Sequence, residues 1–231
     1  MNKKQNPLLR FTLNDVEVIE KIRKYQGFFA LDEYKFRHKL YRGGYSEVLC
    51  REVFDRGDAV AILPYDPITD SIVLIEQFRP GALKNEHGPW QLELIAGMFS
   101  ENEQPLDVAI REAKEEANLT LLAENTMKVM KYFSSTGGMS ECIHLYVACV
   151  DSTCVEGACV DSANIDGAHV GGIYGLAEEG EDILVHLISR NKALSLLEQG
   201  KIANAATIIA LQWLTLNRDK FTKVSHDSST K

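Results

Sequence analysis

Residues 97–119 read GMFSENEQPLDVAIREAKEEANL, and this stretch decides the interpretation of the chain. Its glycine, Gly97, follows an apolar segment over 90–96 that we expect to be a strand. A helix is then expected over 105–117, because proline is favourable in the first turn of a helix and the apolar residues recur at helical spacing. The stretch is therefore interpreted as a strand, a loop and a helix in that order.

Three glutamates of this helix, Glu112, Glu115 and Glu116, share one face, because residues three or four positions apart are neighbours on a helix. Like charges at this spacing repel each other, whereas hard divalent cations bind carboxylate oxygens. The string EAKEE alone is common on solvated helix faces. The full pattern, G-x5-E-x7-R-E-x2-E-E, has six fixed positions, and its chance of arising at a given start site is about one in ten million.

The pattern resembles the Nudix box, in which a glycine and an apolar residue follow the helix. Ala113 is small for an apolar position of the box, and Asn118 replaces the glycine. Asparagine tolerates the left-handed conformation that closes a helix, so the box is read as intact. Strands interleaved with a few helices indicate an α+β or an α/β fold. The resemblance implies the α/β fold, a Nudix α/β/α sandwich around a mixed sheet. It also implies hydrolysis that depends on Mg²⁺, for which Mn²⁺ is expected to substitute.

Further strings extend the resemblance over most of the chain, to the ADP-ribose pyrophosphatase branch of this family. They are GFF (27–29), CREVFDRG (50–57), LIEQFR (74–79), ELIAGM (93–98), STGGMSE (135–141) and EEGED (178–182). The branch converts ADP-ribose and water to AMP and ribose 5-phosphate. Its β-rich N-terminal part is exchanged between two subunits, so the resemblance implies a homodimer in which each active site borrows residues from its partner.

The resemblance also assigns roles to individual residues. The implied metal ligands are the carbonyl of Ala96 and the carboxylates of Glu112, Glu116 and Glu181, with Glu115 shared or adjacent. Glu179 is the implied general base, with Glu178 as the alternative, and Arg111 and Glu115 complete the catalytic group. The residues expected to reach substrate from the partner subunit are Phe28, Phe29, Arg51 and Glu52. Those expected to line the pocket are Arg56, Arg79, Met98, Ser135, Thr136, Gly137 and Glu141.

Elementary chemistry is consistent with several of these roles. Phe28 offers an aromatic face for adenine, and Arg51 is able to add a cation–π contact. Arg79 suits a phosphate, since its guanidinium is always charged and binds in a bidentate manner. The acidic loop around Glu179 contains a glycine and could close over a site. Thr136 stands where the branch commonly has a proline, which bears on substrate preference.

Composition narrows the remaining possibilities. The 231 residues carry a net charge of −8, and 45% are hydrophobic. A broad nucleic-acid or anionic-membrane surface is therefore not expected. The N-terminus has no apolar core of signal-peptide length and no stretch approaches a membrane span. Five cysteines, an odd number without C-x-x-C spacing, indicate reduced thiols in a cytoplasmic protein.

We expect three parts in the chain: a β-rich N-terminal domain over 1–55, a Nudix hydrolase domain over 56–219 and a flexible tail over 220–231. Besides the strand and helix above, strands are expected at Val16–Phe29, Tyr34–Tyr41, Glu47–Phe54, Ala59–Leu63, Ser71–Gln77, Met127–Phe133, Ile143–Val150 and Ile183–Ser189. Helices are expected at Asn191–Gln199 and Asn204–Leu216, the latter a core helix because its apolar residues recur at helical spacing.

Residues 149–168 form a ten-residue tandem repeat, CVDSTCVEGA followed by CVDSANIDGA. A metal site is conceivable from its aspartates, but a duplicated surface loop is the interpretation we favour, because loops tolerate insertions.

Two other functions remain open. One is a pyrophosphatase for another nucleoside-diphosphate sugar, of the ADP-glucose or GDP-mannose type. The other is a nucleotide-sensing module that has lost turnover. The retained glutamates, Glu112, Glu115, Glu116, Glu179 and Glu181, argue against the second.

Overall fold

The structure is a computed structural model that describes residues 8–155 and 168–221. The chain divides into two compact units. The first contains the N-terminal residues up to Gly57 together with the segment 133–141, and the second contains 58–132 and the chain from Cys142 onward. The first unit therefore adds a later segment to the N-terminal β domain that the sequence places over 1–55.

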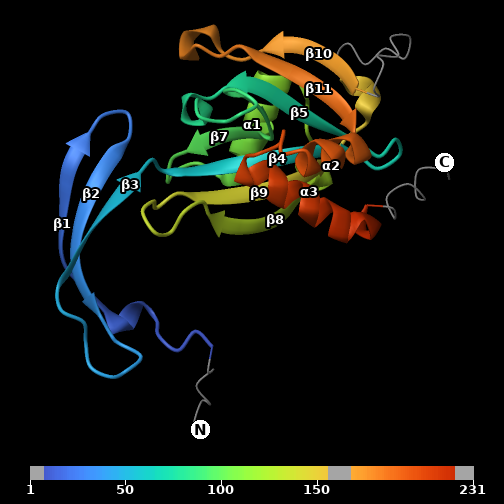
Figure 1. Ribbon diagram of the computed structural model, residues 1–231. Helices are drawn as coiled ribbons and strands as arrows, with labels where there is room; N and C mark the ends of the chain where they lie inside the picture. The colour runs from blue at the N-terminus through green and yellow to red at the C-terminus, as the bar shows by residue number, and fades with distance from the viewer. Residues whose placement is uncertain (1–7, 156–167, 222–231) are drawn as a thin grey trace. The chain divides into compact units, whose positions relative to one another are not determined.

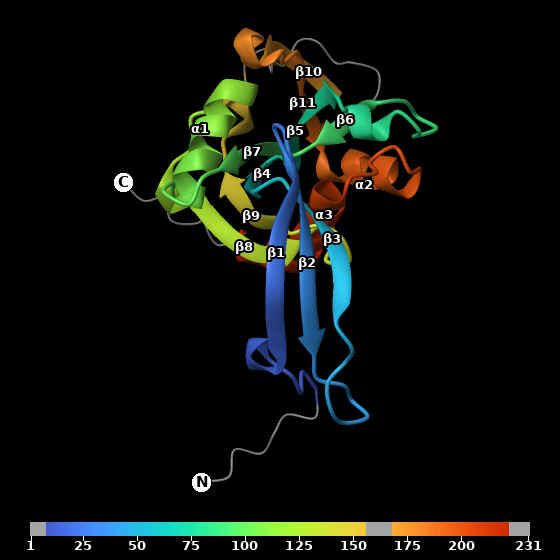
Figure 2. The same ribbon diagram turned by 90° about the vertical axis from the view of Figure 1, so that its left-hand side faces the viewer.

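The first unit is built on an antiparallel sheet in the order β1-β2-β3 (Figure 2). Its elements are a short 3-10 helix, η1 (Leu13–Asp15), and the strands β1 (Val16–Gln26), β2 (Ala30–His38) and β3 (Leu49–Asp55). Of the residues in these strands only Ala30 and Asp32 are buried. Lys21 and Arg23 pair with the Asp32 carboxylate. This sheet thus buries little apolar surface of its own.

The second unit contains an eight-stranded mixed sheet. Its strands are β4 (Asp58–Asp66), β5 (Ser71–Phe78), β6 (Trp90–Glu93), β7 (Ile95–Phe99), β8 (Thr126–Phe133), β9 (Cys142–Cys149), β10 (Ala168–Tyr174) and β11 (Ile183–Ser189). The order is β10-β11-β5-β4-β9-β8, with β6 paired to β5 and β7 paired to β4. Strands β4 and β9 are parallel, while β4 pairs antiparallel with β5 and β7, so the sheet is mixed, as the family resemblance implies.

Helices cover both faces of this sheet (Figure 1). Helix α1 (Pro105–Ala117) lies on one face, and α2 (Arg190–Glu198) and α3 (Ala205–Asn217) lie on the other. Alternate residues of β4 serve the two cores: Val60 and Ile62 pack with α1, and Ala61 and Leu63 pack with α3. The expected α/β/α sandwich is confirmed. Short 3-10 helices complete the unit at η2 (Pro80–Ala82), η3 (Ala123–Asn125), η4 (Ser152–Cys154), η5 (Ala177–Glu179) and η6 (Arg218–Lys220).

One expectation about the decisive stretch needs correction. The single strand predicted over 90–96, ending at Gly97, is two strands, β6 and β7, and Gly97 lies inside β7. The break falls at Leu94, because β6 pairs with β5 while β7 pairs with β4. The Leu94 amide, at the change of partner, donates to the hydroxyl of Thr207 on α3, 3.1 Å away.

Two other parts of the structure differ from the sequence-based expectations. The sequence does not predict strand β10, because two adjacent glycines interrupt its strand pattern. In the structure the register of β10 against β11 shifts at the same place, between Val170 and Ile173. Phe221, placed in the expected tail, is buried against Tyr65 and Trp213. Most of the tandem repeat lies outside the described residues. No helix in the described ranges 8–155 and 168–221 is both long and apolar enough to span a membrane.

Candidate active site

Two glutamates of α1 turn inward toward strand β7. The side chain of Glu116 is buried, and one of its carboxylate oxygens accepts a hydrogen bond from the Ala96 amide at 3.0 Å. Glu112 lies one turn earlier with 13% of its side chain exposed. A Cβ on Gly97 would overlap the carboxyl group of Glu112, so the glycine at this position is what lets strand and helix approach. The first glycine of the sequence pattern therefore has a steric role.

Burial strongly perturbs both carboxyl groups. It raises the pKa of Glu116 to about 8, against the opposing effect of the Ala96 hydrogen bond, and Glu112 and Glu181 raise it further. It raises the pKa of Glu112 to about 7, against the opposing effect of Arg111, and Glu115 and Glu181 add to the rise. Three carboxylates that destabilise one another's charge fit a hard divalent cation, which binds oxygen ligands.

The third carboxylate, Glu181, comes from the loop after η5. Its side chain accepts a hydrogen bond from the Leu176 amide at 3.0 Å. Gly175, at φ +103°, donates its own amide to the Glu115 carbonyl of α1, 3.2 Å away. A Cβ on Gly175 would lie 2.6 Å from the Cβ of Glu181. Gly175 thus connects the acidic loop to helix α1 and leaves room for Glu181.

Arg111 and Glu103 hold the rest of the sequence pattern in place. The Arg111 guanidinium pairs with Glu112 at 2.8 Å and with Glu115 at 2.7 Å. The Glu103 carboxylate accepts hydrogen bonds from the amide and hydroxyl of Ser100, both at 2.9 Å, which fixes the loop before the helix. Glu115 is therefore turned toward Arg111, while Glu112 and Glu116 form the inner pair.

The helix end agrees with the sequence reading. Asn118 adopts the left-handed conformation at φ 53° and ψ 25°, and its amide donates to the carbonyls of Ala113 and Lys114. Ala113 is fully buried in the core beneath α1. Both departures from the family pattern are thus accommodated.

Arg79 is the cation expected at this site. It makes an ion pair with Glu93 at 2.8 Å, and its charge opposes the rise in the Glu116 pKa. Glu93 is part of the string ELIAGM (93–98), but the sequence-based reading gives it no role. Met98, expected to line the pocket, is 38% exposed on β7. A pairing between strands β5 and β6 brings Glu93 to Arg79, and sequence spacing does not encode it.

The expected general base lies on the surface. Glu178 and Glu179 are both exposed on η5. Within the ranges 8–155 and 168–221, neither side chain makes a hydrogen bond or an ion pair. The structure therefore brings Glu181 to Glu112 and Glu116, and leaves Glu178 and Glu179 unengaged beside them in the chain.

A second group of expected residues gathers in the first unit. The Arg56 guanidinium lies over the Phe29 ring, 5.2 Å from its centroid, and pairs with Glu141 at 3.1 Å. Glu141 also accepts a hydrogen bond from the Ser134 hydroxyl at 2.6 Å. Phe28 packs edge-on against Phe29 and is 86% exposed. The exposed ring of Phe28 and the guanidinium of Arg56, which both contact Phe29, are suited to a planar, negatively charged ligand.

Of the remaining expected substrate residues, Arg51 and Glu52 lie farther along β3 from that group. In the register of β2 and β3, Arg51 lies opposite Tyr34 and Glu52 lies opposite Glu33. Arg51 is four positions along β3 from Asp55, or about 13 Å. Both side chains are exposed. Ser135, Thr136 and Gly137 lie in the exposed turn between β8 and β9, where the Ser135 carbonyl accepts from the amides of Gly138 and Met139.

Comparison with known proteins identifies what this chain is similar to. Residues 55–170 match the model of the NUDIX domain. The chain is 45% identical to an ADP-ribose pyrophosphatase of Escherichia coli strain K12 over 94% of its own length and 96% of that protein. It is 36% identical to a GDP-mannose pyrophosphatase of Cronobacter sakazakii over 72% of its length and 78% of that protein. A solved structure described as an ADP compounds hydrolase shares the fold, with a TM-score of 0.60 at 17% identity, covering 94% of this chain and 98% of that one.

Proposed function

This chain belongs to the NUDIX family, and from that membership we propose that it is a divalent-cation-dependent hydrolase of ADP-ribose. The reaction is ADP-ribose plus water giving AMP and ribose 5-phosphate. The observation that carries the proposal is the convergence of Glu112, Glu116 and Glu181, whose charges oppose one another in a buried setting. The substrate is taken from the relative that is similar over nearly its full length.

The carboxylates of Glu112, Glu116 and Glu181 and the carbonyl of Ala96 would hold the cation, which we propose to be Mg²⁺. When bound, Mg²⁺ supplies positive charge against a pyrophosphate and lowers the pKa of water. The hydrogen bond from the Ala96 amide keeps the Glu116 carboxylate aimed at this place. Arg111 orients Glu112 through their ion pair.

Other residues of the chain act on the substrate. Arg79, oriented by Glu93, binds a phosphate oxygen of the pyrophosphate. Glu179 accepts the proton of the attacking water, after the acidic loop has moved it to the substrate. Phe28 and Arg51, supplied by the partner subunit of a homodimer, stack on the adenine. These three roles rest on the resemblance to the family.

The first unit supports the homodimer. Its three strands bury only two of their residues, and Val18, Ile19 and Tyr25 are exposed on β1. A sheet of this size needs an apolar face packed against something else to be stable. A second copy of the chain supplies that cover in the proposed dimer.

A second substrate class has a specific observation in its favour. The GDP-mannose pyrophosphatase relative is 36% identical, so cleavage of another nucleoside-diphosphate sugar is the alternative. The base and the sugar distinguish the two, because both substrates present the same pyrophosphate to the carboxylates.

The test is a substrate panel. The purified chain is incubated with ADP-ribose, ADP-glucose and GDP-mannose, each with Mg²⁺ and each with excess chelator, and the products are separated by anion-exchange chromatography. We expect ADP-ribose to be consumed fastest, with equal yields of AMP and ribose 5-phosphate and no reaction in chelator. Faster cleavage of GDP-mannose would favour the alternative. No cleavage of any substrate with Mg²⁺ or Mn²⁺ would contradict the hydrolase proposal and favour a nucleotide-sensing module.

A further inference from the structure

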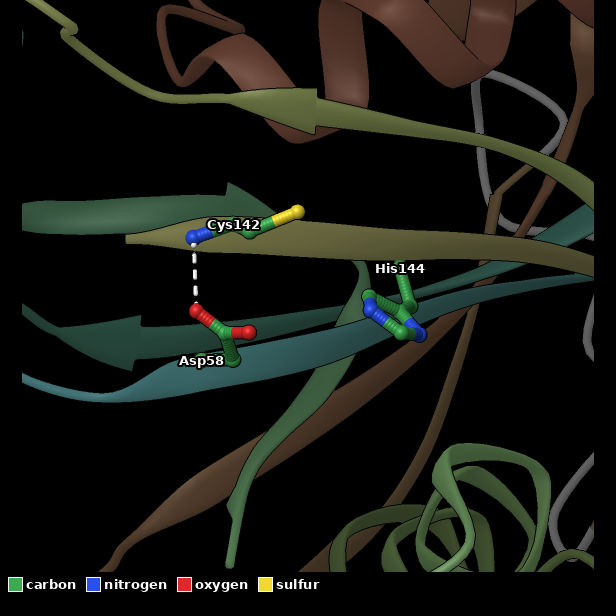
Figure 3. Close-up of side chains that lie close together, drawn as sticks. All are labelled: Asp58, Cys142 and His144. Atoms are coloured by element: carbon green, nitrogen blue, oxygen red, sulfur yellow. Dashed lines mark hydrogen bonds between the residues drawn. The ribbon is translucent and has the colours of Figure 1, made fainter. Parts of the chain in front are cut away.

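A cluster of three different metal-binding side chains lies at the start of two neighbouring strands. Asp58 is the first residue of β4, and Cys142 and His144 are the first and third residues of β9. One ligand atom from each lies within 4.8 Å of the others. Figure 3 shows the three side chains together, with a ring nitrogen of His144 turned toward Asp58. None of them belongs to the carboxylate site described above.

The strand register explains why they meet. Strands β4 and β9 run parallel, with Ala59 opposite Ile143 and Val60 opposite His144. Residues two apart on a strand point to the same face, so Cys142 and His144 emerge side by side. The Cys142 amide donates to the Asp58 carboxylate at 3.0 Å, which holds the two strand starts together and brings that carboxylate beside the cysteine.

His144 provides the independent observation. It is 5% exposed, and its buried Nδ1 has no hydrogen-bond partner among the described residues. Its ring packs edge-on against Phe99 with centroids 5.1 Å apart. A buried polar ring without a partner costs free energy that a bound cation would offset.

We propose that Asp58, Cys142 and His144 form a second metal site, for Zn²⁺ or a transition metal of similar chemistry. A thiolate, an imidazole and a carboxylate are the ligand types of Zn²⁺, whereas Mg²⁺ takes oxygen ligands only. Donor atoms at zinc bond lengths lie roughly 3.5 Å apart, so closing the present spread of up to 4.8 Å takes side-chain shifts of about 1 Å. Water completes the tetrahedron.

The place of the site suggests a structural role. Asp58 and Cys142 are each the first residue of the second unit where the chain enters it from the first. A cation held by both would fix the starts of the central parallel strands. Binding would displace the thiol proton of Cys142 to solvent, so metal uptake releases a proton.

Co²⁺ is the probe, because a thiolate ligand gives cobalt a charge-transfer absorption in the near ultraviolet and oxygen ligands do not. The full-length chain is stripped with chelator, dialysed, and titrated with Co²⁺ in excess Mg²⁺, which occupies the carboxylate site. We expect this absorption to saturate at one Co²⁺ per chain and to be displaced by Zn²⁺. The readout uses no hydrolysis, so it is independent of the substrate assignment.

Matched cysteine variants locate the ligand. Cys149→Ser, at the other end of β9, and Cys50→Ser, on the exposed β3, should keep the absorption, and Cys142→Ser should lose it. Absence of the absorption in the wild-type chain, or its persistence in Cys142→Ser, would overturn the proposal. If Cys142→Ser does not fold, as judged by circular dichroism, then Asp58→Asn and His144→Gln decide: each should weaken Co²⁺ binding at least tenfold, and wild-type affinity in both would overturn the site.

Discussion

At the scale of a single residue, the buried carboxyl group of Glu116 makes the stability of the chain depend on pH. Its pKa is raised from 4.5 to about 8, so the folded chain retains a proton that the unfolded chain loses near pH 4.5. The stability that this group contributes is complete below the unfolded pKa and is lost as the pH rises through about 8. Without a cation, the folded chain at higher pH must therefore ionise a buried carboxyl group.

We expect Glu116→Gln to stabilise the metal-free chain at high pH while strongly lowering its activity. In chelator near pH 9 its free energy of unfolding should exceed that of the wild type by roughly 2 kcal/mol, or about 4–8 °C in Tm. Near pH 4 the two chains should melt alike. With Mg²⁺, turnover should fall by on the order of 10²-fold or more, because a ligand is lost. Thermal melts across pH and a rate assay measure both effects.

Glu115→Gln serves as the control for this prediction. Glu115 lies on the same helix but is 27% exposed and paired with Arg111, so its replacement should bring a much smaller gain in stability at high pH than Glu116→Gln. A Glu116→Gln chain that melts below the wild type in chelator near pH 9 would show that this carboxyl group does not carry the cost we assign to it.

At the scale of elements, the acidic loop depends on Gly175. This residue has positive φ and no space for a Cβ beside Glu181, whereas Gly180, in the same loop with φ +72°, has open space around it. Gly175→Ala should therefore displace Glu181, lower kcat by about 10²-fold and raise the Mg²⁺ concentration needed for activity. Gly180→Ala introduces only the strain of a positive φ, so it should change kcat and the Mg²⁺ requirement much less. Equal effects in the two variants would refute a positioning role for Gly175.

Variants of the same loop should distinguish the proposed general base, Glu179, from the proposed metal ligand, Glu181. Glu179→Gln should lose most of kcat at saturating Mg²⁺, by about 10²–10⁴-fold, with substrate affinity largely kept. Glu181→Gln should instead require more Mg²⁺ and recover part of its activity with it, since Glu181 lies with Glu112 and Glu116. Titrating Mg²⁺ against each variant, with Glu178→Gln alongside, measures the difference. A dead Glu178→Gln with a near-normal Glu179→Gln would move the base by one residue.

At the scale of the whole molecule, the exposed three-stranded sheet predicts an obligate dimer. Sedimentation equilibrium should show a dimer at assay concentrations. If Arg51 serves the partner's site, mixing Arg51→Ala with Glu112→Gln chains under mild denaturation should restore about one quarter of wild-type activity. Half of the dimers are then mixed, and each mixed dimer has one intact site.

Each single variant, put through the same denaturation and refolding, is the control and should stay inactive. No recovery in the mixture would place Arg51 at the site of its own chain. A chain that is monomeric and active would refute the shared site altogether.

The sequence by itself determined the features that depend on local geometry. The bounds of α1, the left-handed cap at Asn118 and the shared face of Glu112 and Glu116 all follow from helical spacing and backbone preference. The α/β/α layering came from the resemblance to the Nudix family, since the order of strands and helices alone fits an α+β or an α/β fold. The family pattern then supplied Glu181, which lies far from the helix in sequence and close to it in the structure.

Only the tertiary structure decided what depends on neighbours from distant parts of the chain. The break at Leu94 arises because β6 pairs with β5 while β7 pairs with β4. The ion pair between Arg79 and Glu93 forms because Arg79 directly follows β5 and Glu93 lies on its neighbour β6. The raised pKa values of Glu112 and Glu116 come chiefly from burial, which no spacing encodes. The meeting of Asp58 with Cys142 and His144 likewise needs the parallel pairing of β4 and β9, since 84 residues separate Asp58 from Cys142. Periodicity specifies which face of an element turns inward, but only folding specifies what it meets there.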